Sequence, residues 1–400
     1  MAKEGISKLK VMDFIKAVPV REKKISAAPS DSIPSLDSYK PNQLASALHP
    51  EKQFLKVSKI VEHSCDIKTF YLVPDKEKGT ENLAWFSAGQ YLSINLTIGN
   101  ATLTRPYSIS SSPRESLDGY YMLTIKRVKD GLASQYILDN WNVGTQVTSS
   151  APLGTFTYEP LRDAKTILGI AGGSGITPFR SLAKAIADGD EEASLILLYG
   201  TRNLQEAIFL DEFEEIAKNC NKFKLVNVLS EEDNENCESG FITADLINKY
   251  KPDSLYSIFI CGPQAMYDFV DKEIESLCLR RKFVRHELFG EFFNPSKESD
   301  YPDNVSNQFN ITVYYDGTKQ TVTANADTSI LRSLESNGIS VPAHCRSGEC
   351  GWCHSKLISG EIYTPKSVDG RREADLLYGY IHPCCSFPLS DIEIQIHPTK

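Results

Sequence analysis

Five cysteines near the end of the chain constrain its fold more than any other feature does. Cys345, Cys350 and Cys353 stand at C-x₄-C-x₂-C spacing, and the adjacent pair Cys384-Cys385 follows further along. This spacing, with one more distant cysteine, is that of the plant-type [2Fe–2S] cluster. The alternatives are a zinc site, which usually takes C-x₂₋₄-C pairs from two separate arms, and a set of structural disulfides.

Glycines between these cysteines favour the cluster. Gly348 and Gly351 permit unusual φ angles and close backbone approach, so that amide N–H groups can point at the sulfurs. The iron–sulfur interpretation is also favoured over zinc by the motifs described below, which call for an acceptor of single electrons.

The sequence around the cysteines predicts a small β-rich domain with one helix across it. A hairpin turn signal at Asp316-Gly317 separates two strand-like segments, and a short helix is expected just before the cysteine loop. The expected strands are 308–315, 319–324, 357–363 and 392–396, and the expected helix is 329–335.

This pattern resembles the ferredoxin fold, a β-grasp. The resemblance implies that Cys384 is the fourth ligand, because ferredoxins place a proline four residues after the last ligand and Pro388 stands there. Cys385 is then expected to be a small buried apolar residue.

Length, charge and cysteine content limit the class of protein. A chain of 400 residues favours two to four domains, and its net charge of −9 argues against general nucleic-acid binding. No apolar run reaches the length of a membrane span, and Asp13 and Lys16 interrupt Val11–Val20, which is therefore too polar for a signal peptide. Ten cysteines without a secretion signal favour a reduced, cytoplasmic setting with a metal cofactor.

The chain changes character along its length. Residues 1–52 form a basic extension punctuated by Ser and Pro, with at most a short amphipathic turn around Leu9–Ile15; they are expected to be a loose tail or a docking arm. Short strands at close intervals then predict a small antiparallel barrel. These strands are expected at 54–60, 67–72, 90–96, 120–128 and 146–149.

After Thr166 the period lengthens, and strands alternate with helices as in a doubly wound parallel sheet. The strands are expected at 167–169, 194–199, 224–228 and 257–261, and the helices at 179–187, 210–218, 244–249 and 266–277.

Four motifs lie in these two regions. Bare backbone N–H groups at a helix N-terminus, with glycines that permit close approach, suit a pyrophosphate, although the third motif is not the usual G-x-G-x-x-G fingerprint. The motifs are Arg105-Pro106-Tyr107-Ser108, Gly131-Leu132-Ala133-Ser134, Gly172-Gly173-Ser174-Gly175-Ile176-Thr177-Pro178 and Cys261-Gly262-Pro263-Gln264-Ala265-Met266.

In this order the four motifs resemble the ferredoxin–NADP⁺ reductase superfamily. With the ferredoxin-like end, residues 53–400 resemble three-domain reductases that feed Rieske oxygenases, and hybrid-cluster-protein reductases. The resemblance implies an N-terminal extension (1–52), an FAD-binding barrel (53–162), an NAD(P)-binding domain (163–290), a linker (291–307) and a [2Fe–2S] domain (308–400).

The resemblance also implies residue roles. In the barrel, Arg105 would pair with flavin phosphate, Pro106 and Tyr107 would lie against the flavin, and Ser108 would hydrogen-bond near its N5. Catalytic positions would be Ser108, Thr177 and Cys261. Thr177 would sit near the flavin ring. The flavin pyrophosphate would be held by Gly131, Ala133 and Ser134, the nicotinamide nucleotide by Gly172, Gly173, Gly175, Cys261 and Gly262, and the cluster by Cys345, Cys350, Cys353 and Cys384.

Two points depart from the family pattern. Plant-type reductases end in an aromatic residue that covers the flavin, whereas here the chain continues and Phe289 is expected to take that place. The coenzyme is NADH or NADPH, with NADH favoured by analogy, because Arg202 suits either. FAD is favoured over FMN by Gly131–Ser134, and FMN remains an alternative.

The expected activity follows from electron counting. A nicotinamide gives up two electrons as hydride, whereas an iron–sulfur centre takes one at a time, and a flavin can mediate between them. We therefore expect an NAD(P)H-dependent reductase whose acceptor is a separate metalloprotein, such as an oxygenase or a hybrid-cluster protein. The alternatives are reverse flow from a reduced partner to NAD(P)⁺ and a redox-sensing subunit of a larger complex.

Overall fold

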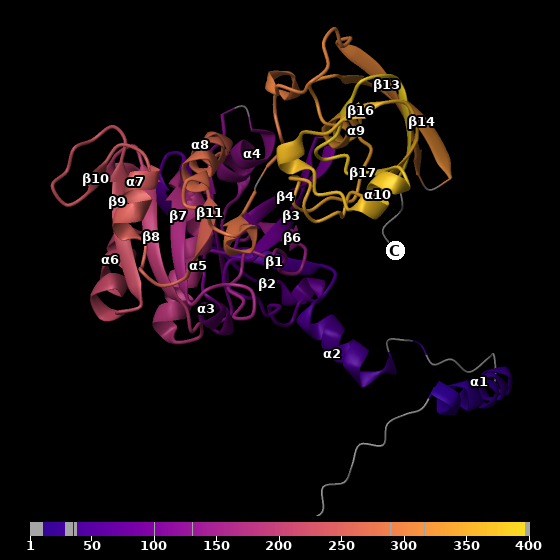
Figure 1. The fold of residues 1–400 in the computed structure, drawn as a ribbon, viewed down its shortest axis with the longest axis horizontal. Coiled ribbons are helices and arrows are strands. Elements are labelled where there is room, and N and C mark those ends of the chain that lie inside the picture. The colour runs from indigo at the N-terminus through magenta and orange to yellow at the C-terminus, as the bar shows by residue number, and fades with distance from the viewer. Residues whose placement is uncertain are drawn as a thin grey trace, which may run out of the picture. The chain divides into compact units, whose positions relative to one another are not determined.

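The computed structural model describes residues 11–28, 35, 38–99, 101–129, 131–288, 290–315 and 317–396. The chain divides into two compact units, residues 1–48 and 49–400. The second unit holds three successive β-sheet regions (Figure 1). These correspond to the barrel, the doubly wound sheet and the β-grasp that the sequence predicts, so the predicted fold class is confirmed.

The N-terminal unit contains two helices, α1 (Val11–Ser26) and α2 (Lys40–Leu48). The expectation that no long regular segment occurs here is wrong for α1, which continues through Pro19. The residues of α1 and α2 whose side chains are described are all exposed. Backbone hydrogen bonds and good helix formers, rather than a buried face, therefore account for both helices.

The first sheet is an antiparallel barrel. Its edge strands are joined by a bridge between Ile109 and Leu123, which closes the sheet. Alternating burial along the first strand, with Leu55 and Val57 inward and Lys56 outward, gives the apolar interior. The strands are β1 (Gln53–Ser64), β2 (Ile67–Pro74), β3 (Tyr91–Ile98), β4 (Ala101–Ser108), β5 (Tyr121–Lys126) and β6 (Gln146–Ser149), in the order β4-β3-β6-β1-β2-β5. Helices α3 (Pro113–Leu117) and α4 (Leu132–Asn140) connect them.

The second sheet is parallel throughout. Its strands are β7 (Thr166–Gly172), β8 (Ser194–Thr201), β9 (Phe223–Leu229), β10 (Glu238–Ser239), β11 (Tyr256–Cys261) and β12 (Val284–His286), in the order β10-β9-β8-β7-β11-β12. Its helices are α5 (Thr177–Asp188), α6 (Leu210–Asn219), α7 (Ala244–Tyr250) and α8 (Gln264–Glu275). From β7 to β10 successive strands are added on one side of β7, and β11 and β12 are added on its other side. The carboxyl ends of β7 and β11 therefore form the switch point where such sheets bind ligands.

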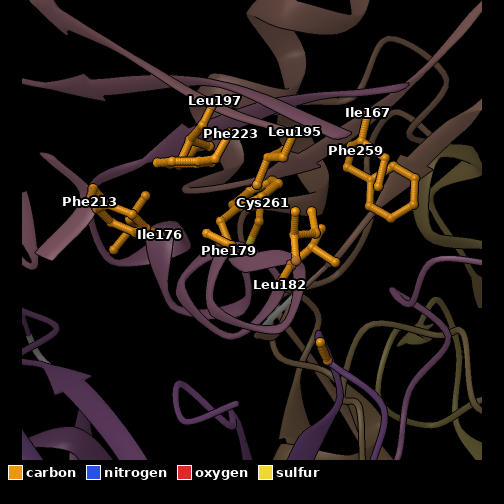
Figure 2. Packing of buried hydrophobic residues seen from close by; sticks show 14 of the residues in the cluster. Ile167, Ile176, Phe179, Leu182, Leu195, Leu197, Phe213, Phe223, Phe259 and Cys261 are labelled. Carbon is orange, nitrogen blue, oxygen red and sulfur yellow. The ribbon is translucent and has the colours of Figure 1, made fainter. Parts of the chain in front are cut away.

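Helices cover both faces of this sheet. On one face, Phe179 and Leu182 of α5 and Phe213 of α6 pack with Leu195 and Phe259 of the strands (Figure 2). On the other face, α7 and α8 bury a second apolar cluster against alternate residues of the same strands. A sheet covered on both sides explains the nearly continuous apolar strands seen in the sequence.

The third sheet is the β-grasp. Its strands are β13 (Gln308–Tyr315), β14 (Thr318–Asn325), β15 (Ser355–Ser359), β17 (Tyr380–Ile381) and β19 (Ile392–Ile396), in the order β14-β13-β19-β15-β17, with β13 and β19 parallel. Helix α9 (Ile330–Ser336) packs across it, with Ser329 as its N-cap. The other elements are β16 (Ile362–Tyr363), β18 (Phe387–Pro388) and α10 (Glu373–Leu377).

The predicted strand 357–363 is interrupted. Gly360 has a φ of +94°, and a Cβ there would lie 2.4 Å from the carbonyl oxygen of Asp391. The segment therefore splits into β15 and β16, which belong to different sheets.

Candidate functional site

The four predicted ligand cysteines come together in the third domain. The sulfurs of Cys353 and Cys384 lie 3.4 Å apart, and the thiol of Cys345 interacts with those of Cys350 and Cys384. Hydrogen bonds from Cys350 and Cys384 hold the pKa of the Cys345 thiol well below its ordinary value. Four converging cysteine sulfurs are the donor set that a [2Fe–2S] cluster needs.

Backbone amides of the cysteine loop point at these sulfurs. The amides of Ser347 and Cys350 donate to the sulfur of Cys345 at 3.5 and 3.3 Å, and the amide of Trp352 donates to Cys350 at 3.5 Å. Such donors stabilise the negative charge of thiolates.

Gly348 and Cys385 shape the surroundings of the loop. Gly348 has a φ of +85°, and a Cβ there would lie 2.1 Å from the carbonyl oxygen of Val368, so only glycine fits. The buried thiol of Cys385 donates to the carbonyl oxygen of His382 at 3.5 Å. Cys385 is therefore held by the protein backbone, as expected of a thiol outside the ligand set.

The motif Arg105–Ser108 forms the end of β4, a strand that is not among those expected from the sequence. The side chain of Ser108 is buried, and its hydroxyl has no hydrogen-bond partner among the described residues. A buried hydroxyl without a partner in the protein suits a binding site in which a polar ligand supplies the hydrogen bond. Burial raises the pKa of Tyr107, so its phenol stays neutral. Pro106 pairs with Ser93 of β3 in the barrel wall.

Arg105 has partners within the protein. Its Nη1 donates to the carbonyl oxygen of Thr104 at 2.8 Å, and its Nη2 lies 3.4 Å from the carboxylate of Glu291. A guanidinium carries five N–H donors, so Arg105 retains capacity for a phosphate. Its assignment to the flavin phosphate stays a prediction.

The motif Gly131–Ser134 forms the N-terminus of α4. Gly131 is the N-cap and has no side-chain cap hydrogen bond; a Cβ there would lie 2.8 Å from the Cβ of Val128. The hydroxyl of Ser134 accepts a hydrogen bond from the amide of Val128 at 3.0 Å, and Ala133 packs into the barrel core. The helix therefore offers backbone amides, while Ala133 and Ser134 hold the turn in shape.

The other two glycine motifs interlock at the switch point. A Cβ on Gly175 would lie 2.1 Å from the carbonyl oxygen of Cys261, and one on Gly172 or Gly262 would collide with the sulfur of Met266. Gly173 has a φ of +52°. Absent side chains thus allow these segments, far apart in sequence, to pack backbone against backbone.

Thr177 and Cys261 flank this packing. The hydroxyl of Thr177 donates to the carbonyl oxygen of Ser174 at 3.1 Å at the start of α5. Cys261 is 1% exposed and lies within the apolar cluster shown in Figure 2. Burial raises the pKa of its thiol well above the ordinary value, so Cys261 is a neutral thiol at the base of the site.

A cavity of about 590 Å³ opens beside the same edge of the sheet, between the barrel and the nucleotide domain. Lys126 of the barrel and Arg202 and Glu206 of the second domain line it. Glu206 pairs with Arg202 at 2.5 Å and with Lys126 at 3.8 Å. Sequence reasoning missed Lys126 and Glu206, because their approach depends on how two domains meet.

Comparison with known families identifies all three domains. Residues 55–158 match the oxidoreductase FAD-binding domain, residues 170–272 the oxidoreductase NAD-binding domain, and residues 313–389 the 2Fe-2S iron-sulfur cluster binding domain. The chain belongs to the three-domain reductases of the ferredoxin–NADP⁺ reductase superfamily. It is an NAD(P)H-dependent oxidoreductase that carries FAD and a [2Fe–2S] cluster.

Similar proteins include several reductase components. The chain is 29% identical to NADH oxidoreductase HCR of Escherichia coli (strain K12), over 77% of this chain and 88% of that protein. It is 26% identical to the glycine betaine monooxygenase reductase subunit of Chromohalobacter salexigens, over 84% of this chain and 93% of that one. The solved structure of phthalate dioxygenase reductase covers 87% of this chain and 98% of its own, with a TM-score of 0.61 and 26% identity.

The residues of this reductase fit the cofactors of its domains. The converging thiols suit the cluster, and the unpaired hydroxyl of Ser108 next to the partly buried Tyr107 suits a flavin ring. Phe289, expected to cover the flavin, lies outside the described residues. In the part of the chain that the structure describes, no helix combines the length and apolar character needed to cross a bilayer.

Proposed function

We propose that this reductase takes hydride from NADH and delivers single electrons to a separate metalloenzyme, most plainly an oxygenase. Support for the partner class comes from relatives named as reductase components of monooxygenases, which the chain matches over most of their length. The chain's three matched domains account for electron entry and transfer.

One observation carries the proposal. The hydroxyl of Thr104, next to the flavin motif on β4, donates to the carbonyl oxygen of Ala343 in the cysteine loop at 2.7 Å. A flavin held by Arg105–Ser108 and a cluster held by Cys345 would therefore lie on neighbouring segments. Their proximity suits direct transfer of single electrons.

The protein's own residues have binding and orienting roles in this proposal. When bound, FAD accepts a hydride from the nicotinamide and releases its two electrons singly to the iron–sulfur cluster. Ser108 orients the flavin through its free hydroxyl, and backbone amides at Gly131–Ser134 and Gly172–Gly175 hold the phosphates. The buried Cys261 closes the nicotinamide pocket without contributing charge.

The charges of the cavity favour NADH over NADPH. Arg202, the cation nearest in sequence to the end of β8, is already paired with Glu206. A carboxylate there can accept hydrogen bonds from the ribose hydroxyls and repels a 2′-phosphate. We therefore expect a clearly higher kcat/KM for NADH.

The proposal also includes the cellular compartment of the protein and the boundaries of its domains. None of the ten cysteines, all of which the structure describes, forms a disulfide, which suits the reducing cytoplasm. We place the domain boundaries at residues 53–162, 163–290 and 308–400. Limited proteolysis tests them, because the linker 291–307 should be cut before the sheets are.

Steady-state reduction of cytochrome c and ferricyanide by NADH and NADPH tests the function. We expect rapid turnover with NADH, and iron and FAD in the purified protein. Slow NADH oxidation combined with fast reoxidation of the reduced protein by NAD⁺ would indicate reverse flow. A protein that holds its cofactors and turns over no acceptor would indicate a redox sensor, and either result would contradict the proposal.

A further inference from the structure

A cluster of charged side chains lies where the cysteine loop meets β4. Its centre is Arg346, the residue after Cys345, which is 1% exposed and has a φ of +61°. A non-glycine residue in this region of φ is strained, so its surroundings must hold it there. The members of the cluster are Arg105, Glu291, Arg332, Glu335 and Arg346.

Two buried carboxylates hold Arg346. Its Nη1 and Nη2 donate to the two carboxylate oxygens of Glu335, each at 2.7 Å, and its Nε donates to Glu291 at 2.9 Å. Burial alone would lower the pKa of Arg346, but both carboxylates outweigh burial and raise that pKa. Glu335 lies on α9 of the same domain, so that pair is internal to the ferredoxin domain.

Glu291 differs from Glu335 because its ion pairs reach residues of two domains. Its carboxylate, 6% exposed, also lies 3.4 Å from Nη2 of Arg105 on β4 and 4.0 Å from Arg332. Burial alone would raise the pKa of Glu291, but Arg346 and Arg105 outweigh it and hold that pKa below its ordinary value. One ionised carboxylate at the start of the linker therefore joins the flavin strand to the cysteine loop.

Hydrogen bonds to backbone carbonyl oxygens act at the same place. Besides the bond from Thr104 to Ala343, Nη1 of Arg346 donates to the carbonyl oxygen of Thr104 at 3.3 Å. Within this cluster, three guanidinium groups face two carboxylates, so the cluster as a whole carries one surplus positive charge. That surplus leaves Arg105 able to bind an anionic flavin phosphate while it stays paired with Glu291.

We propose that Glu291 is a positioning residue that fixes the cysteine loop against the flavin strand and so sets the flavin-to-cluster separation. The inference rests on the proposed function and adds the residue that makes its single-electron step efficient. Glu291 exchanges no atom or electron; one electron passes from the reduced flavin to one ferric ion, which becomes ferrous.

The test compares Glu291→Gln with Glu335→Gln in the full-length, cofactor-loaded protein. Each variant loses one carboxylate charge next to Arg346, but only the first removes the charge pair with β4. In stopped-flow reduction by NADH, we expect E291Q to keep flavin reduction and to slow cluster reduction on the order of tenfold or more, because small misplacements of reacting centres are costly. E335Q should keep a near wild-type rate for both phases.

Hydrogen exchange supplies a readout other than activity. In E291Q we expect faster amide exchange both in residues 101–108 and in residues 343–347, whereas E335Q should affect only the second segment. Thr104→Val provides a neutral variant that leaves no buried charge unpaired. It should slow cluster reduction in the same direction by a smaller factor.

Several results would overturn the inference. If E291Q reduced its cluster at the wild-type rate, Glu291 would not be a positioning residue. If E291Q and E335Q slowed cluster reduction equally, the effect would come from the stability of the cysteine loop alone. Loss of flavin or iron from E291Q would assign Glu291 to binding rather than positioning. A wild-type protein that reduced its flavin but never its cluster would overturn the proposed function itself, and this inference with it.

Discussion

Cys384 and Cys385 are adjacent in the chain, but their thiols have different surroundings. The sulfur of Cys384 faces Cys353 at 3.4 Å, whereas the thiol of Cys385 donates to the carbonyl oxygen of His382. Both are buried, so burial does not distinguish a ligand from a structural thiol. The direction in which the thiol points does distinguish them, because a ligand must face the other ligand sulfurs.

Replacing each of these cysteines with serine tests this distinction. We expect Cys384→Ser to lose the visible absorbance of the cluster and cytochrome c reduction, while flavin-linked ferricyanide reduction persists. Cys385→Ser should retain the cluster, since a hydroxyl can also donate to His382. Absorbance spectra and iron analysis of both variants check this; loss of iron from the Cys385 variant alone would reverse the assignment.

Glu191 provides a prediction of pH dependence at the residue scale. Burial, and then the charges of Glu159 and Asp190, raise the pKa of Glu191 to about 7 in the folded protein. The folded state therefore binds this proton more tightly than the unfolded state, so stability falls as pH rises from the ordinary glutamate range towards 7. We expect Glu191→Gln to raise stability at pH 8 by about 1 kcal/mol or more and to change it little at pH 4.

Thermal unfolding at both pH values measures this effect. Glu192→Gln is the matched control, because Glu192 is the exposed neighbour and loses the same charge. Equal stabilisation by both substitutions would attribute the effect to net charge instead of burial.

At the scale of elements, the nucleotide site depends on glycines, because their lack of a side chain lets neighbouring segments come close. Strands β7 and β11 run side by side in register, from Thr166 beside Tyr256 to Ala171 beside Cys261. The loops after both strands therefore meet at the same edge, where Gly172, Gly175 and Gly262 allow contact. Each of these glycines is required because another segment of the chain packs against it, rather than because its own turn needs a glycine conformation.

Gly175→Ala tests this packing. A Cβ 2.1 Å from the carbonyl oxygen of Cys261 must displace the backbone, so we expect a loss of stability of about 1–3 kcal/mol and weaker NADH binding. Gly200→Ala is the control, because its Cβ would lie 3.5 Å from its nearest neighbours, an ordinary contact. Denaturant unfolding and KM for NADH report the two effects; a Gly175 variant as stable as the Gly200 variant would contradict the prediction.

At the scale of the molecule, buried ion pairs join the domains on both sides of the barrel. On one side Glu291 links the barrel to the ferredoxin domain. On the other, Arg180 of α5 donates to Glu115 of the barrel at 2.9 Å and to Glu212 of α6 at 2.6 Å. Burial alone would lower the pKa of Arg180, but these carboxylates raise it. Such pairs hold the sheets in the arrangement that electron transfer needs.

Arg180→Met should strongly destabilise the protein. It leaves Glu115 and Glu212 without their partner at the interface, and breaking a buried pair costs about 3 kcal/mol or more. Arg114→Met is the control, since Arg114 pairs with Asp190 at the exposed rim of the same interface and should matter little. Thermal unfolding compares them, and similar melting temperatures for the two variants would contradict the expected role of burial.

Local sequence patterns predicted the three sheet types, because strand alternation and turn residues are encoded over short stretches. They missed β4, which ends in Arg105–Ser108, and α4, which begins at Gly131–Ser134, since neither element is among those expected from the sequence. They also missed α1, whose described side chains are exposed and which therefore lacks the apolar periodicity of a packed helix.

Sequence alone determined the class of chemistry, since cysteine spacing and glycine motifs dictate which cofactors a backbone can hold. Only the tertiary structure decided which groups meet across domains: Thr104 with Ala343, Glu291 with both Arg105 and Arg346, and Lys126 with Glu206. The reason is physical: such contacts join residues far apart in the chain, and their energy depends on burial and orientation, which no local pattern specifies.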